Sequence, residues 1–504
     1  MSFISAGFFI TIAVTAIIYY LVPYKVRWYV LLIMSYAFLL TYGISCIGFL
    51  TFSILNTYVF TRIMDTCDSK RIRKRYLILA ICLNFGILFF LKYCNFLIIN
   101  INSLFTVTGA GIHINKISLI MPLGISFYTF QNMSYLIDVY HRKYPCEKNI
   151  LKLALFSGFL PQILQGPIGR FDRLAPQLFG KVEFDIKNVE YGVQRIAWGL
   201  AKKLILADRG YVISNTIFSN LNVFSGVHII VAMLMFSVYE YCDFSGGIDV
   251  VIGVAEIFGI KLDENFRQPY FSKSIGEFWR RWHITLGTWM KDYIFYPFSI
   301  SKPIHRLSKR LQKIFGKTTG RIIPVCLSNI LIFFIVGIWH GAAWKYIIYG
   351  LYNGIIIAAS NLLKPVYGKM FEVTHINSES KVWGAVQVIR TFILVNIGWL
   401  FDGCATAGLA FKALGRIFVN FNMSVLSDKS LLKMGLNIRD WKVFGVALII
   451  LIIVSVLKEK GVKIRDKVSS MPLVLKWALY IILIFAPAPF GFVGSTTEFM
   501  YAQF

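Results

Sequence analysis

The chain has 504 residues, of which 57% are hydrophobic and 15% are charged, and its mean hydropathy is +0.64. Soluble domains carry about 25% charged residues, so this composition excludes an ordinary soluble protein and predicts an all-α, multi-pass membrane protein. The formal net charge of +27 does not indicate nucleic-acid binding, because the basic residues lie in short segments between apolar stretches, as in many membrane proteins. The eight cysteines show no ligand spacing, and we expect no metal site and no bound cofactor.

The first part of the chain is predicted to be a domain of membrane helices, residues 1–116. Residues 3–22, 29–60 and 76–99 are apolar, and the basic run Lys70–Arg75 marks the cytoplasmic side. No basic residue precedes Lys25, so the first span lacks the charged start of a signal peptide. We therefore expect it to be retained, with the N-terminus outside.

The next stretch is unusually polar for a membrane segment. MPLGISFYTFQ begins at Met121, and polar groups in lipid must be buried against other helices or a cavity. Further on, the prolines and glycines of PQILQGPIGR, residues 161–170, favour a turn or a re-entrant loop. Two interpretations remain open: a loop in which Gln165 and Arg170 meet a phosphate-bearing donor, or a plain connection between helices.

Acidic residues stand out in the stretch from residue 210 to residue 260, which contains no lysine or arginine. Glu240 and Asp243 are three residues apart and would share one face of a helix. Acids at membrane depth need partners, so structural ion pairs are favoured over direct chemistry.

Residues 278–297 read FWRRWHITLGTWMKDYIFYP, with an aromatic stripe at spacings of three and four residues. This stripe consists of Trp279, Trp282, Leu286, Trp289 and Tyr293. The spacing predicts one amphipathic helix lying along the membrane surface, with His283 at the border of the stripe. A basic segment follows at residues 302–321 and predicts that this side is cytoplasmic.

A single imidazole, His340, lies in an apolar run without Asp, Glu, Lys or Arg, residues 322–344. An ionisable group in a span is costly and is a functional-site hypothesis by default, although a histidine bonded to a neighbouring helix is the alternative. This span belongs to a predicted core domain, residues 117–363. Residues 364–504 form a C-terminal domain with further spans, giving about eleven to thirteen in all.

Several motifs together resemble the membrane-bound O-acyltransferase family. They are MPLGISFYTFQ, PQILQGPIGRF, EYCDFSGGIDV, NFRQPY, WRRWHITLGTWMKDYIFYP and IWHGAAW. The match is best to the bacterial branch, which includes alginate and peptidoglycan O-acetylation proteins and the D-alanyl transfer protein of teichoic acids. The resemblance implies a ring of helices around a central tunnel, with re-entrant helices. It also implies that His340 is the catalytic histidine and His283 the second, motif-bearing one.

The implied reaction moves an acyl group, most simply acetyl, from a cytoplasmic thioester such as acetyl-CoA to a cell-envelope polysaccharide outside. His340 would act as the base and His283 would position the donor. Asn265, Trp339 or backbone N–H groups would stabilise the oxyanion. Further donor or tunnel-lining candidates are Trp282, Gln165, Arg170 and Asp243. Two alternatives stay open: D-alanyl transfer to teichoic acid from a carrier protein, and a transporter or flippase of a small polar substrate.

The C-terminal residues Phe499, Tyr501 and Phe504 fit a terminal F-x-Y-x-x-F pattern of related O-acylation systems. This resemblance implies that Tyr501 accepts the acyl group and passes it to an extracellular SGNH-type esterase or transferase. The other interpretation is an aromatic anchor at the outer interface. We expect a protein of the bacterial cytoplasmic membrane, in contact with membrane lipids but not with nucleic acid, with both termini outside.

Overall fold

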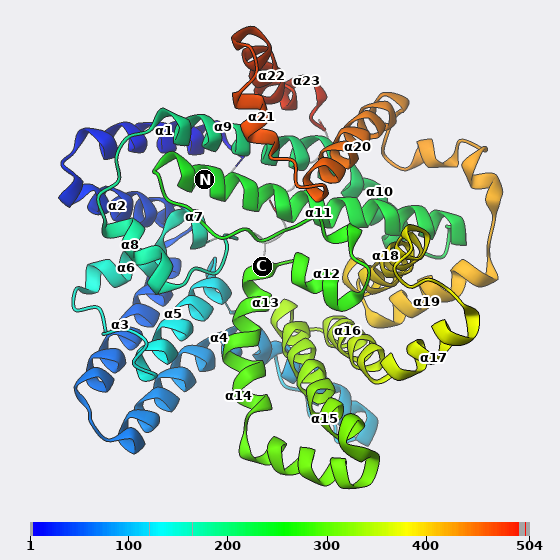
Figure 1. Ribbon diagram of the computed structural model, residues 1–504, viewed down its shortest axis with the longest axis horizontal. Helices are drawn as coiled ribbons and strands as arrows, with labels where there is room; N and C mark the ends of the chain where they lie inside the picture. Colours follow the sequence, from blue (N-terminus) through cyan, green and yellow to red (C-terminus); the bar gives the residue numbers. More distant parts are fainter. Residues whose placement is uncertain (1–3, 120, 164, 493–498, 500–504) are drawn as a thin grey trace.

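The computed structural model describes residues 4–119, 121–163, 165–492 and 499. This part of the chain is helical, and its one β-type contact is an isolated bridge between Phe266 and Trp282. Figure 1 shows the short helices α12 (Ile275–Arg281) and α13 (Ile284–Met290) near the middle of the molecule, with longer helices around them. The predicted all-α, multi-pass class is therefore confirmed.

Seven helices of the described chain are long and apolar enough to cross a membrane. They are α3 (Ile44–Thr66), α4 (Lys70–Thr108), α11 (Gly226–Ile257), α15 (Lys302–His340), α18 (Lys381–Gly403), α20 (Ile438–Glu459) and Leu473–Phe490, which comprises α22 and α23. A bent pair, α16 (Trp344–Leu362) with α17 (Lys364–Thr374), would make eight. The larger predicted number counted apolar stretches that form shorter helices, such as α1 (Ala6–Leu21), α2 (Arg27–Leu40) and α5 (Ile125–Tyr140).

The central element is α11, whose apolar window is 72% buried and therefore faces protein more than lipid. It packs against α9 (Ile186–Ala201), which continues into the π-helical turn η2 (Lys202–Ala207) and α10 (Asp208–Ser219). Glycines bring these backbones together, because a Cβ on Gly253 would lie 2.6 Å from the carbonyl oxygen of Gly192. Small residues at such contacts let membrane helices approach closely.

Helices α15 and α16 form a hairpin that carries His340 at its turn. Gly341–Ala343 separate the two helices, and a Cβ on Gly337 would lie 2.4 Å from the carbonyl oxygen of Tyr346. The close packing of the two helices therefore fixes the end of α15. The remaining helices are α6 (Ile150–Gly158), α7 (Leu160–Ile163), α8 (Phe171–Phe179), α14 (Tyr296–Ser299), α19 (Ala407–Val419) and α21 (Ile464–Ser469).

The prediction of one surface helix over residues 278–297 is wrong. The segment breaks at His283, whose φ of 47° is left-handed, and continues as α13, the π-helical η4 (Lys291–Phe295) and α14. Trp282 and Trp289 are buried in the core rather than at the interface. The aromatic stripe is therefore the interior packing face of two short helices, with His283 at their junction.

Candidate active site

His283 is held by the side chain of Asn265, an extended-segment residue between α11 and α12. The Oδ1 atom of Asn265 accepts hydrogen bonds from the backbone N–H of Thr285 at 3.0 Å and from its hydroxyl at 3.0 Å. An N–H group only donates, so it identifies this atom of the amide as the oxygen. The Nδ1 atom of His283 lies 3.3 Å from the same oxygen.

This contact fixes the tautomer of His283. Because an amide oxygen only accepts, Nδ1 carries the proton, and Nε2 is left with a lone pair. Burial lowers the pKa of the His283 imidazole, with the nearby His340 adding to the effect. The ring is therefore neutral near pH 7 and presents an acceptor toward the interior.

Both histidines contact Trp339. The ring centroid of Trp339 is 5.6 Å from that of His283 and 5.0 Å from that of His340. Beyond it, His340 stacks on Tyr346, at 6.2 Å, and meets the edge of Tyr349, at 5.9 Å. The structure thus brings together four sequence-predicted site residues that come from two distant parts of the chain: Asn265, His283, Trp339 and His340.

Helix α4 secures the end of α15 that carries His340. The last carbonyl groups of a helix have no partner within it. Here the Nζ of Lys92 donates to the carbonyl oxygen of Trp339, and the hydroxyl of Tyr93 donates to that of Ile338. A positive charge is also favourable at a helix C-terminus. Lys92 was missed in the sequence, although a lone charge in the apolar stretch 76–99 was a usable signal.

A small cavity opens beside His340. It is lined by Lys92, Trp339 and His340 and, from the opposite side, by residues 124–127 at the start of α5. The polar motif beginning at Met121 was predicted to be buried against other helices or a cavity, and its residues 125 and 127–136 are buried, which confirms that prediction.

Of the other predicted residues, Gln165 and Trp282 lie in the interior and Arg170 at its margin. Gln165 is fully buried against Gly247 of α11, because a Cβ added to Gly247 would lie 1.4 Å from the Nε2 atom of Gln165. Neither side-chain amide atom of Gln165 has a hydrogen-bond partner among the described residues. Trp282 packs against Phe266 at 5.0 Å. Arg170 pairs with Asp292 at 2.9 Å and lies over the Tyr293 ring. Residues 161–163 and 165–170 are thus part of a buried, broken helical connection with polar side chains facing the interior.

Three acids of α11, Asp243, Asp249 and Glu256, make the ion pairs that were favoured, with partners from α9, η2 and α21. Asp243 pairs with Lys203 at 2.6 Å, and both side chains are fully buried. Lys203 also pairs with Asp208, at 2.9 Å. Glu240 differs, because its Oε1 has no hydrogen-bond partner in the described part of the chain. Arg267, a base that follows in the sequence, does not pair with these acids; helix packing brings in Lys203 instead.

The C-terminal tail is described at one position. Phe499 is buried, with 2% of its surface exposed, and its ring lies 5.5 Å from the Lys203 ammonium. This residue therefore packs inside the protein beside the buried ion pairs, and not at an outer interface. Tyr501 and Phe504 lie outside the described residues.

The sequence matches proteins of known family. Residues 147–312, which include Asn265 and His283, match the membrane-bound O-acyltransferase family, MBOAT. The chain is 30% identical over 412 residues to a probable alginate O-acetylase, AlgI, of Azotobacter vinelandii, covering 82% of this chain and 76% of the relative. It is 29% identical to the peptidoglycan O-acetyltransferase of Helicobacter pylori, covering 72% and 68% of the two chains. It is 30% identical to the teichoic acid D-alanyltransferase of Bacillus subtilis, covering 57% and 70%.

A relative of this identity and coverage, together with the family match and the paired histidines, identifies the chain: it belongs to the membrane-bound O-acyltransferase family and is an O-acyltransferase.

Proposed function

We propose that the protein transfers an acetyl group from a cytoplasmic acyl thioester, such as acetyl-CoA, to a hydroxyl of a cell-envelope polysaccharide on the outer side of a bacterial cytoplasmic membrane. The observation that carries this proposal is that the imidazoles of His283 and His340 both contact Trp339, with His340 beside a cavity. The relatives named for O-acetylation of alginate and of peptidoglycan support acetyl as the group and a polysaccharide as the final acceptor.

In the proposed reaction, His340 takes the proton of the acceptor hydroxyl as its oxygen attacks the thioester carbonyl. A tetrahedral oxyanion forms, the carbon–sulfur bond breaks, and the proton returns to the leaving sulfur to give a free thiol. His283, which also contacts Trp339, orients the donor. A buried site strengthens both interactions because little water competes for the polar groups.

The developing oxyanion requires a hydrogen-bond donor, and Asn265 is the best placed of the predicted candidates. Its Oδ1 is engaged by Thr285 and His283, so its Nδ2 is turned away from them. Nδ2 is buried and has no hydrogen-bond partner among the described residues, which leaves it available to substrate. The indole N–H of Trp339 is the second candidate.

We infer the direction of transfer from the positive-inside rule: the basic segments at residues 70–75, 302–321 and 458–467 would face the cytoplasm, and both termini would then be outside. We further propose that Tyr501 is the first hydroxyl acceptor and hands the acyl group to an extracellular SGNH-type partner. The burial of Phe499 supports this step, because it ties the tail to the protein interior two residues before Tyr501.

The proposal is tested by His340→Ala in cells that contain the partner machinery. Loss of one general base should lower acetyl transfer about 10²–10⁴-fold, while the protein inserts and accumulates as the wild type does. Polysaccharide acetylation at the wild-type level in a well-expressed variant would refute the role of His340. Purified protein supplied with radiolabelled acetyl-CoA or with a D-alanyl carrier protein distinguishes acetyl from D-alanyl transfer.

A further inference from the structure

A second and larger cavity lies away from the histidines, between α9, η2 and α11 on one side and α20–α22 on the other. Its volume is about 780 Å³. In Figure 1, α20–α22 lie at the edge of the molecule, beyond α9 and α11. These outer helices are little buried within the chain, with 11% of the apolar window of α20 and 6% of that of the α22 segment covered. The cavity is therefore formed where weakly packed, lipid-exposed helices meet the core.

The two ends of this cavity differ in chemistry. The outer helices supply a continuous apolar wall, formed by Ile450, Leu451, Val454, Leu479, Ile482 and Leu483. The other end is lined by charged residues from α9, α11, residues 264–268 and α21. An apolar shaft that ends in a charged site fits an amphiphile rather than a wholly polar solute or a hydrocarbon.

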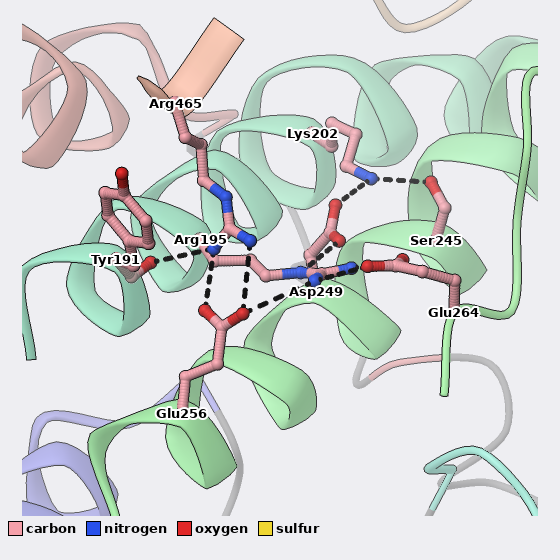
Figure 2. Close-up of polar contacts among 8 residues, drawn as sticks. All are labelled: Tyr191, Arg195, Lys202, Ser245, Asp249, Glu256, Glu264 and Arg465. Carbon is pink, nitrogen blue, oxygen red and sulfur yellow. Dashed lines mark hydrogen bonds and ion pairs between the residues drawn. The ribbon is translucent and has the colours of Figure 1, made fainter. Parts of the chain in front are cut away.

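Several cations at the charged end are paired with carboxylates of the same protein, as Figure 2 shows. Arg195 pairs with Asp249 at 2.9 Å and with Glu264 at 2.5 Å, and Lys202 pairs with Asp249 at 2.6 Å. Arg465 pairs with Glu256 at 2.7 Å. These contacts hold α9, α11 and α21 together, and the carboxylates neutralise much of the positive charge of Arg195, Lys202 and Arg465.

Three further cations line the same end without such partners. The side chains of Arg267, Lys458 and Lys463 make no hydrogen bond or ion pair with any residue that the structure describes. Besides Asp249 and Glu264, one more acid lines the cavity: Asp466, which accepts a hydrogen bond from the hydroxyl of Tyr191 at 3.0 Å. The charged end of the cavity is therefore left with unneutralised positive charge beside an apolar shaft.

We propose that this cavity binds an anionic phospholipid, with its phosphate among Arg267, Lys458 and Lys463 and its acyl chains along α20 and α22. Lysine and arginine side chains attract anionic headgroups, and the apolar wall takes up the chains. A neutral lipid would fill the shaft but leave the cations unmatched. A free phosphate would match the cations but leave the apolar wall bare.

The bound lipid would also support the site around His283. Phe266 lines the cavity and packs against Trp282 at 5.0 Å and Phe244 at 4.9 Å, and the Phe244 ring lies 4.9 Å from that of His283. The neighbouring residue Asn265 bonds to His283 directly. The segment 265–267 therefore connects the lipid phosphate to the imidazole. Only this effect of the lipid on His283 rests on the proposed function.

Binding is tested on the full-length protein in nanodiscs of phosphatidylcholine that contain a minority of phosphatidylglycerol. The lipid retained by the released protein is identified by native mass spectrometry. We expect phosphatidylglycerol to be enriched over its bulk share. The triple variant Arg267→Gln, Lys458→Gln, Lys463→Gln should retain at least about tenfold less of it.

The matched control is Lys309→Gln, Arg310→Gln, Lys313→Gln, which removes the same charge from the start of α15, outside this cavity. It should retain phosphatidylglycerol as the wild type does. Equal retention in both triple variants, no enrichment in the wild type, or a nucleotide thioester as the retained molecule would each overturn the proposal. No acyl donor is added in this experiment, so the absence of lipid enrichment leaves the proposed reaction untouched.

A measurement on the wild-type protein keeps the test decisive if the triple variant does not fold. A photoactivatable phosphatidylglycerol with its reactive group in the acyl chain should label peptides containing residues 450–454 and 479–483. Labelling that is confined to other helices would refute this site.

Discussion

His283 occupies a backbone conformation that side chains other than glycine rarely adopt. Its φ of 47° costs on the order of 1–3 kcal/mol, and such strain persists only where the surroundings enforce it. Here the backbone carbonyl of Asn265 accepts from the N–H of Ile284 at 3.0 Å, while the Asn265 side chain binds both Thr285 and His283. A single asparagine therefore holds both the turn and the imidazole.

We expect Asn265→Ala to lower kcat about 10²-fold, because His283 loses the acceptor that orients its ring. Asn265→Asp keeps that acceptor but lacks the Nδ2 donor, so its kcat should lie between those of the alanine variant and the wild type. Its carboxylate would favour imidazolium and raise the pKa of His283, so the acid limb of the pH–rate profile should move to higher pH. Rates and thermal unfolding are measured for both variants. Wild-type kcat in the alanine variant would contradict the positioning role.

The contact of Lys92 with α15 gives a second prediction at this scale. Lys92→Met removes the donor to the Trp339 carbonyl and frees the end of the helix that carries His340. The expected result is a fall in kcat of about tenfold or more with little change in KM, since the loss affects orientation rather than donor binding. Lys92→Arg should restore much of the rate. Equal kcat for the methionine variant and the wild type would rule out this role.

At the scale of elements, the aromatic stripe of residues 278–297 shows which structural features sequence periodicity predicts and which it does not. The spacing correctly grouped Trp282, Leu286 and Trp289 on one face, and all three are buried together. It could not show the break at His283, because the break depends on Phe266 and Asn265, which lie about twenty residues earlier and form a bridge and hydrogen bonds across space. The same tertiary contacts turn a predicted surface helix into an interior one.

Accessibility of α13 to labelling follows from this placement. Thr288 is exposed, whereas Thr285 is buried and its hydroxyl accepts from the backbone N–H of Ile168 at 3.1 Å. A cysteine at Thr288 should therefore react with an impermeant maleimide from the cytoplasmic side, and a cysteine at Thr285 should not. Labelling of the Thr288 cysteine from outside would reverse the assigned orientation. Fast labelling at Thr285 would contradict the buried position of α13.

At the scale of the whole molecule, composition predicted the class and the order of motifs predicted the family. The sequence indicates His340 and His283 as separate features, and only the fold reveals that both contact Trp339. Lys203 was not predicted at all, because its sequence neighbourhood does not show that it is buried between Asp208 and Asp243. Long-range pairs of this kind depend on helix packing, which one sequence does not encode locally.

The tail provides a prediction for the complete system. Tyr501→Phe keeps the ring and removes the hydroxyl, so the protein should accumulate normally while polysaccharide acetylation is lost. An acyl-tyrosine should be detectable by peptide mass spectrometry when the extracellular partner is deleted. The matched control is Tyr367→Phe in α17, which also removes one phenol oxygen and should have no effect. Intact acetylation in the Tyr501→Phe variant would leave the tail as an anchor only.

The ion pair between Lys203 and Asp243 also constrains how the nascent chain enters the bilayer. Each charge alone would add about 2.5–3.5 kcal/mol to the insertion of its own segment at mid-membrane. The two charges lie on consecutive segments, η2 with α10 and then α11, and they compensate each other only when both segments are in place. Asp208 compensates Lys203 within its own segment, so Asp243 on α11 is the charge that needs the neighbouring segment, and joint entry of the two segments as one helical hairpin would supply its partner.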